Sequence, residues 1–259
     1  MLDPFLILTP VLLLAIVALL GFVGCYQPVA GSAPVVMHVQ TVVNSAPVGT
    51  KSITAGPLTL QGGELIIATL QWRTVSVQPA PAVTLTAGSS MLALAPVPGG
   101  GPFDWNTMIV QSFFVFNPQG STSVSVQAVL TIGSNIQWNL CASAYENVDL
   151  QVPVYNPEPE QNYPAPYFGT NPQTSAINIG SPGDLVYAVA FAATNNGTFP
   201  GGTSIAAGPN FTAESGNVKN PLVEDLPQPN TNSVVAEATV SGDANPRAFI
   251  FAMGLKSAA

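Results

Sequence analysis

A single histidine, His38, limits the chemistry that the chain can carry out. A serine or cysteine nucleophile needs a neighbouring base, and His38 would have to be that base. The chain contains no Gly-x-Ser-x-Gly motif, and neither Cys25 nor Cys141 lies in a sequence typical of a catalytic cysteine. His38 occupies an alternating run, on the side opposite Met37 and Val39. The sequence therefore predicts a surface-strand histidine, no catalytic residues and no enzymatic activity.

Metal ligands are equally sparse in the sequence. One histidine and two separated cysteines do not give the ligand spacing of a zinc site. Calcium remains open because loop carboxylates can bind it, and Glu146 and Asp149, which follow an apolar run, are the best candidates. A disulfide between Cys25 and Cys141 also stays open. We expect no metal site and no cofactor.

Residues 149–173 form the segment most suited to binding a partner. The segment contains six prolines and no strand alternation, and a connection this long is usually a binding loop or a flexible segment. Prolines restrict its freedom before binding, while tyrosines offer a large contact area with a polar tip. The alternative is a crossover loop that covers one end of the fold. We predict partner contacts through five aromatic residues: Tyr155, Tyr163, Tyr167, Phe168 and Trp105.

The rest of the sequence after residue 35 predicts β-strands. Polar and apolar residues alternate at 35–43, 83–86, 91–95 and 121–130, and turns rich in glycine and proline separate such runs. No helical period lasts for three turns beyond the N-terminal region. We therefore expect an all-β fold in which residues 35–259 form one two-sheet antiparallel β-sandwich, wired as a jelly roll or Greek key.

A weak internal repeat divides this region into two halves. Residues 63–68 match residues 183–188, and each segment joins a glycine turn and an acid to a nearly continuous apolar run. The acid is expected to accept hydrogen bonds from turn amides, and the run to be a central strand covered on both faces. Duplication into two small domains is the alternative to one sandwich. One sandwich predicts a shared interior that contains Leu65, Ile67, Leu185, Tyr187, Phe249 and Phe251.

Residues 1–26 are predicted to be a membrane anchor. Segment 5–24 contains twenty residues with Thr9 as its only hydrogen-bonding side chain. Such a helix would be about 30 Å long, the thickness of the hydrocarbon core of a bilayer. A cleaved secretory signal is one alternative, although no lysine or arginine precedes the apolar run. A lipoprotein signal is another, because residues 22–25 are similar to a lipobox that ends at Cys25. Residues 27–34 would then be a short linker.

Charge and composition restrict the partners and the location. The chain has five lysines and arginines against thirteen aspartates and glutamates, a net charge of −8, which argues against nucleic-acid binding. Basic residues near the span are missing, so the positive-inside rule does not orient it. The region after the anchor is poor in charge and rich in Thr, Ser, Asn and Gln. This composition favours a membrane-anchored protein whose main domain is periplasmic or extracellular.

Several structural motifs recur in a known group of sequences. Residues 183–186 (GDLV) begin an apolar run, an apolar run at 247–253 closes the domain, and residues 2–5 precede the segment 19–25 (LLGFVGC). In these motifs the chain resembles uncharacterised bacterial exported β-sandwich proteins that are anchored in the membrane at their N-termini. The resemblance implies a β-sandwich and no particular activity.

Together these features favour a non-enzymatic, membrane-anchored structural or accessory subunit. Its sandwich would scaffold or stabilise a larger membrane protein assembly, such as a respiratory or photosynthetic complex, or a surface filament or layer. The expected partners are the bilayer, through residues 5–24, and other protein subunits. The alternative is a carbohydrate-binding or adhesion module in which Trp72, Trp105 or the tyrosines of residues 149–173 stack on sugar rings. A hydrolase is the third hypothesis.

Overall fold

The computed structural model describes most of the chain after residue 33. The described residues are 34–47, 49–73, 81–105, 108–129, 137–161, 163, 167–193, 203–216, 220–227, 233–242 and 246–259. Their regular elements are β-strands, which confirms the all-β prediction. None of these residues belongs to a helix long and apolar enough to cross a membrane. The predicted anchor and the linker up to residue 33 lie outside the described part. Residues 34–259 form one compact unit.

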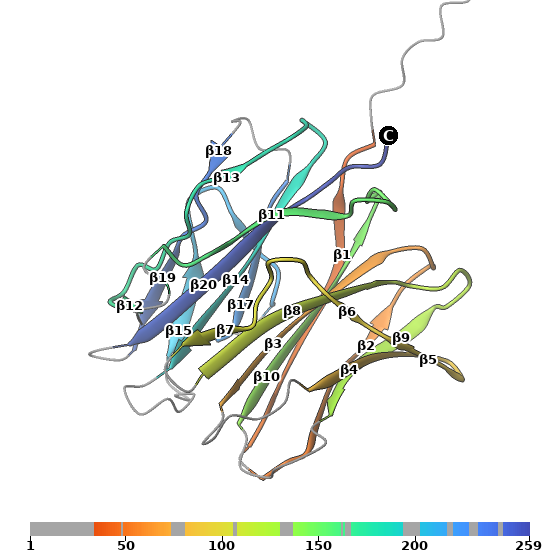
Figure 1. The fold of residues 1–259 in the computed structure, drawn as a ribbon, viewed down its shortest axis with the longest axis horizontal. Coiled ribbons are helices and arrows are strands. Elements are labelled where there is room, and N and C mark those ends of the chain that lie inside the picture. Colours follow the sequence, from red (N-terminus) through yellow and green to blue (C-terminus); the bar gives the residue numbers. More distant parts are fainter. Residues whose placement is uncertain are drawn as a thin grey trace, which may run out of the picture. The chain divides into compact units, whose positions relative to one another are not determined.

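The N-terminal half of this unit is a two-sheet antiparallel sandwich (Figure 1). Its first sheet has the order β1-β10-β3-β8-β6, with β7 also paired to β8. Its second sheet has the order β2-β9-β4-β5. The two strand orders together give the topology of a jelly roll, one of the two topologies that the sequence predicted. The strands are β1 (Met37–Ala46), β2 (Ser52–Thr59), β3 (Leu65–Arg73), β4 (Ala82–Ala87), β5 (Ser90–Ala93), β6 (Ala95–Pro96), β7 (Phe103–Trp105), β8 (Met108–Phe116), β9 (Ser123–Val129) and β10 (Trp138–Glu146).

The C-terminal half repeats the same arrangement with shorter outer strands. Its main sheet has the order β11-β20-β14-β17-β16, with β12 also paired to β20, and two short pairs, β13-β18 and β15-β19, complete it. The order β11-β20-β14-β17 therefore mirrors β1-β10-β3-β8. The strands are β11 (Val154–Pro159), β12 (Tyr167–Phe168), β13 (Ile177–Asn178), β14 (Leu185–Ala193), β15 (Ser204–Ala207), β16 (Thr212–Ala213), β17 (Leu222–Pro227), β18 (Ser233–Val234), β19 (Ala238–Ser241) and β20 (Arg247–Leu255).

Three hydrophobic cores separate four layers of strands. The first core lies between the two N-terminal sheets, and the third lies between the C-terminal main sheet and its short outer strands. The middle core joins the two main sheets to each other. Alternation along β3 explains this, because Ile66 and Ala68 face the first core whereas Leu65 and Ile67 face the middle one. A strand covered on both faces is buried along its whole length, as β3, β10, β14 and β20 are apart from one terminal residue in three of them, and its sequence is therefore mostly apolar.

The prediction of a single two-sheet sandwich is wrong in its number of sheets. The chain folds as two sandwiches, because four apolar runs covered on both faces require additional layers on either side. The prediction of a shared interior is confirmed, since the middle core contains all six residues named for it: Leu65, Ile67, Leu185, Tyr187, Phe249 and Phe251. The internal repeat thus corresponds to a repeated sheet whose two copies share one core.

The matched acids also occupy equivalent places before the central strands. Glu64 precedes β3 and accepts hydrogen bonds from the backbone N–H groups of Gln61 (2.6 Å) and Gly62 (2.9 Å) and from Asn117 Nδ2 (2.9 Å). Asp184 precedes β14 and is fully buried. Gly62 and Gly63 both have positive φ, 103° and 97°, which is the conformation that glycine tolerates. The predicted glycine-acid turn is therefore confirmed at Glu64, whereas Asp184 accepts its hydrogen bonds from Tyr155 and Ser257, which are distant in sequence, and not from amides of its own turn.

Candidate functional site

The segment 149–173 is more regular than its sequence predicted. It contains β11 and β12, which both pair with β20 along one side of the C-terminal main sheet. The expectation of a long connection without strands is therefore wrong. Proline is tolerated here because β11 is an edge strand, where one side of the backbone needs no ladder partner. The register shifts between Tyr155 and Glu158, and Asn156 has a positive φ of 45°, as expected for a bulged edge.

Tyr155, one of the predicted partner-binding residues, is tied to its own domain. It pairs in register with Gly254 of β20, and a Cβ atom at Gly254 would lie 2.6 Å from Tyr155 Cε2. The ring therefore covers the glycine, a pairing that stabilises sheets where a glycine leaves a gap. Its hydroxyl donates a hydrogen bond to Asp184 Oδ2 (2.7 Å) and accepts one from Gly180 N (3.2 Å). Burial, together with the hydrogen bond to Asp184, raises the pKa of Tyr155.

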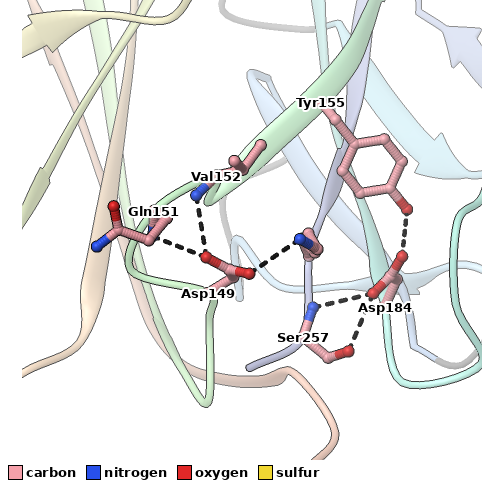
Figure 2. Close-up of polar contacts among 7 residues, drawn as sticks. Asp149, Gln151, Val152, Tyr155, Asp184 and Ser257 are labelled. Carbon is pink, nitrogen blue, oxygen red and sulfur yellow. Dashed lines mark hydrogen bonds and ion pairs between the residues drawn. The ribbon is translucent and has the colours of Figure 1, made fainter. Parts of the chain in front are cut away.

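Asp184 is the centre of a small polar network at this place (Figure 2). Its Oδ1 accepts hydrogen bonds from the Ser257 backbone N–H (2.9 Å) and from Ser257 Oγ (3.1 Å). The carboxylate therefore joins the turn before β14 to β11 and to the C-terminal residues. These contacts satisfy a side chain that is fully buried.

Asp149, a calcium candidate from the sequence, stabilises a turn instead. Its Oδ1 accepts hydrogen bonds from the backbone N–H groups of Gln151 (2.7 Å) and Val152 (3.0 Å) (Figure 2). Its Oδ2 lies 3.0 Å from Lys256 Nζ. The hydrogen bond from Val152, followed by the contact with Lys256, lowers the pKa of Asp149 from 3.8 to about 2. The carboxylate is thus occupied by one cation and two amides, which does not favour calcium binding.

The turn at Asp149 gives a first testable prediction. A lowered pKa in the folded state means that the ionised carboxylate stabilises the fold above pH 3.8, and that this stabilisation is lost as the pH falls towards 2. Carboxyl-carbon NMR should show Asp149 titrating near pH 2. The variant Lys256→Gln keeps the turn amides but removes the cation, so the midpoint should rise part of the way. A midpoint at 3.8 in the parent protein would contradict the prediction.

The other predicted aromatic contacts divide into two groups. Tyr163 packs internally, since its ring lies edge-on to Phe103 (centroids 5.3 Å apart) and to Phe249 (6.4 Å). The side chains of Tyr167, Phe168 and Trp105 lie outside the described part of the structure, so partner binding by these residues stays a prediction. Trp72, considered for sugar stacking, is 1% exposed in the first core and cannot reach a ligand. Cys141 is a free, buried thiol, which does not support a disulfide with Cys25.

A cluster that the sequence did not reveal forms around His38. His38 Nδ1 lies 2.9 Å from Glu214 Oε2, and a carboxylate oxygen of Asp225 completes a group of three ligand-type atoms within 4.8 Å of one another. Glu214 directly follows β16, where its N–H donates to the carbonyl of Val223 (2.8 Å). Asp225 projects from β17 towards the N-terminal sandwich, because its Oδ1 accepts a hydrogen bond from Tyr145 of β10 (2.9 Å).

A bulge in β1 gives His38 its orientation. The register against β10 shifts between His38 and Gln40, so that His38 is opposite Tyr145 and Thr41 is opposite Ser143. Residues three apart in a regular strand face opposite sides, whereas the bulge brings His38 and Thr41 together. His38 Nε2 lies 2.8 Å from Thr41 Oγ1, which in turn lies 2.8 Å from Ser143 Oγ. The interpretation of His38 as an ordinary surface-strand residue is therefore wrong.

Burial dominates the electrostatics of this cluster. It lowers the pKa of His38 to about 4 and raises the pKa of Glu214. Burial also raises the pKa of Asp225 well above its usual range, although the hydrogen bond from Tyr145 opposes this. Tyr145 stacks edge-on against His38 at 5.5 Å. The arrangement of a carboxylate, His38 and a hydroxyl is similar to a catalytic triad, but Thr41 Oγ1 is held by Ser143, which favours a binding role over a nucleophilic one.

Sequence reasoning could not have assembled this cluster. Its histidine and its acids are separated by more than 170 positions, and the bulge reverses the expected side of the strand. One signal was available, because Glu224 and Asp225 interrupt the apolar run Leu222–Pro227, where charged side chains are expected to be buried.

Comparisons with known proteins add little to this description. No protein-family model matches the chain, and no curated protein matches it. Two solved structures are similar over most of their length: the major capsid protein of mavirus (9% identity, 85% of this chain and 86% of that chain, TM-score 0.21) and Cucumber Necrosis Virus (11% identity, 90% and 96%, TM-score 0.22). At these scores neither likeness supports an argument about this chain.

Proposed function

We propose that the chain is a non-enzymatic structural or accessory subunit that is anchored in a membrane through residues 5–24 and meets other subunits through its two sandwiches. The observation that carries this proposal is the continuous packing from the first core through the middle core to the third. Two sandwiches joined by a shared core make a stiff body, because close-packed interiors resist deformation. Such a body is suited to spacing or supporting partners outside the bilayer.

The end of this body that receives the anchor is defined by backbone contacts. Val36 N donates to the carbonyl of Gly183 (3.0 Å), and Asn147 Nδ2 donates to the carbonyl of Val35 (3.0 Å). In a chain anchored by residues 5–24, the anchor would be joined to the end that contains Val35 and Asn147.

Two exposed apolar side chains lie just beyond Asn147 in the sequence. Leu150 is 69% exposed and Val152 is 49% exposed, and Asp149 fixes the turn that presents them. Exposed apolar side chains on a stable turn favour a contact with a partner or with the bilayer interface. This turn is the contact that we assign to the assembly.

Native purification tests the proposal. The full chain, extracted from its own membrane in mild detergent, should elute with other subunits at a size well above that of the monomer. The double variant Leu150→Ser/Val152→Ser should reduce that association several-fold. Met91→Ser is the matched control, because Met91 is 65% exposed on β5, which belongs to the other N-terminal sheet. A parent chain that elutes alone would contradict the proposal.

Carbohydrate binding remains the alternative function. Trp72 is excluded and Tyr155 and Tyr163 are packed internally, so sugar stacking would rest on Trp105, Tyr167 and Phe168. A glycan array separates the two functions. Binding that Trp105→Ala or Tyr167→Ala abolishes, without loss of association, would favour the adhesion module over the structural subunit.

A further inference from the structure

We propose that His38, Glu214 and Asp225 bind a divalent transition-metal cation of the zinc class between the two sandwiches. The three ligand-type atoms lie within 4.8 Å of one another, and the shortest separation, from His38 Nδ1 to Glu214 Oε2, is 2.9 Å. A tetrahedral zinc ion with bonds near 2.0–2.1 Å places its ligand atoms roughly 3.4 Å apart. Small side-chain adjustments would therefore suffice to bring the three atoms around one cation.

A buried carboxyl oxygen of Asp225 without a partner is the second observation that indicates a cation. Asp225 is 1% exposed, and its Oδ2 has no hydrogen-bond partner among the described residues. Its Oδ1 accepts a hydrogen bond from Tyr145, and the second acid, Glu214, is close by. Lys256, one of the few cations of the chain, is paired with Asp149 instead. A buried carboxyl oxygen without a partner is costly, and a divalent cation would supply a partner to both acids.

The donor set selects the kind of metal. Calcium and magnesium prefer oxygen ligands alone, whereas an imidazole nitrogen with carboxylate oxygens suits zinc and neighbouring transition metals. Three protein ligands leave one tetrahedral position for water. His38 and Glu214 have partly exposed side chains, 17% and 21%, so a cation can enter from solvent.

The surrounding hydrogen bonds support the ligands in the way that metal sites require. A metal-bound histidine usually donates its second ring N–H to a fixed acceptor. The Nε2 atom of His38 has such a partner in Thr41 Oγ1, and Thr41 can pass a hydrogen bond on to Ser143. Tyr145 orients Asp225 in the same manner. This site does not depend on the proposed structural function, and it would link β1 of one sandwich to β17 of the other.

Metal titration of the full chain tests the site. Tag-free protein in detergent, carrying Cys25→Ser to remove the non-core thiol, is titrated with Zn²⁺ by calorimetry and with Co²⁺ by visible absorption. We expect one Zn²⁺ per chain, a Co²⁺ spectrum of nitrogen and oxygen ligation, and a higher unfolding temperature with Zn²⁺. His38→Gln and Glu214→Gln should each weaken Zn²⁺ binding by at least about 100-fold, and Thr41→Val by about tenfold.

Matched controls keep the outcome unambiguous. Asp104→Asn removes an exposed acid on β7 and should leave Zn²⁺ affinity unchanged. Circular dichroism without metal verifies that each variant is folded, and Thr41→Val provides a second, conservative variant should His38→Gln fail to fold. A parent protein that binds no Zn²⁺, or a folded His38→Gln variant with parental affinity, would overturn the proposal and show that protons alone neutralise the cluster.

Discussion

Replacing Phe251 with alanine should lower the free energy of unfolding by about 3–5 kcal/mol, the usual cost of truncating a buried phenylalanine. Phe251 is fully buried on β20 within the middle core. Its ring lies 5.4 Å from that of Phe103, which belongs to the N-terminal sandwich. The truncation therefore removes a contact between the two sandwiches as well as apolar area within one of them.

Tryptophan fluorescence can measure whether this loss of stability also lowers the stability of the N-terminal sandwich. Trp72 and Trp138 both lie in the first core, on the far side of the N-terminal main sheet from Phe251. If the sandwiches unfold together, urea denaturation followed by fluorescence and by far-UV circular dichroism should shift to the same lower midpoint in Phe251→Ala.

A control on the same strand sharpens this test. Ile250 neighbours Phe251 but faces the third core, away from the N-terminal sandwich. Ile250→Ala should cost about 2–5 kcal/mol and should also move the fluorescence midpoint, because cooperative unfolding spreads any local loss. A fluorescence transition that stays in place in both variants, beside a second transition in circular dichroism, would show that the halves unfold independently.

Strands could be predicted from the sequence where polar and apolar residues alternate. Alternation at residues 83–86 and 121–130 places Val83, Leu85, Val124 and Val126 inward in the structure, as strands with one covered face require. The glycine-acid turns likewise begin central strands. These signals are local in the sequence, so they can be recognised without knowledge of the tertiary structure.

The number of layers could not be predicted, because it depends on which elements cover the second face of each central strand. A strand such as β14 is apolar on both faces, but its sequence does not say whether its second face meets the partner sheet or a further layer. The short strands β13, β15, β18 and β19 that supply this layer have two to four residues each. Runs of that length carry too little periodicity to predict.

The candidate sites were missed for a related reason. Tyr155 is of a residue type that is common at interfaces, yet its ring covers Gly254 of the neighbouring strand. His38 was assigned to the surface because the β1 bulge has no sequence signature. In both cases a partner distant in sequence decides what the side chain does, and composition alone does not identify that partner.

Replacing Asp184 with alanine should lower the free energy of unfolding by about 3–5 kcal/mol. Hydrogen bonds to a charged group contribute about 1.5–3 kcal/mol each, and loss of the acceptor leaves buried donors unpaired. Asp184 accepts hydrogen bonds from Tyr155 Oη, the Ser257 N–H and Ser257 Oγ. Glu64→Ala, the equivalent change before β3, should be damaging for the same reason.

A double-mutant cycle with Tyr155→Phe assigns the part of this loss that belongs to the tyrosine. Tyr155→Phe removes one donor but keeps the ring over Gly254, so it should cost about 1–2 kcal/mol alone. In the Asp184→Ala background the same change should cost close to nothing, because the hydroxyl has already lost its main acceptor. Urea denaturation of the four proteins measures the coupling. Equal costs of Tyr155→Phe in both backgrounds would mean that the hydroxyl contributes through its contact with Gly180 N, and not through its hydrogen bond to Asp184.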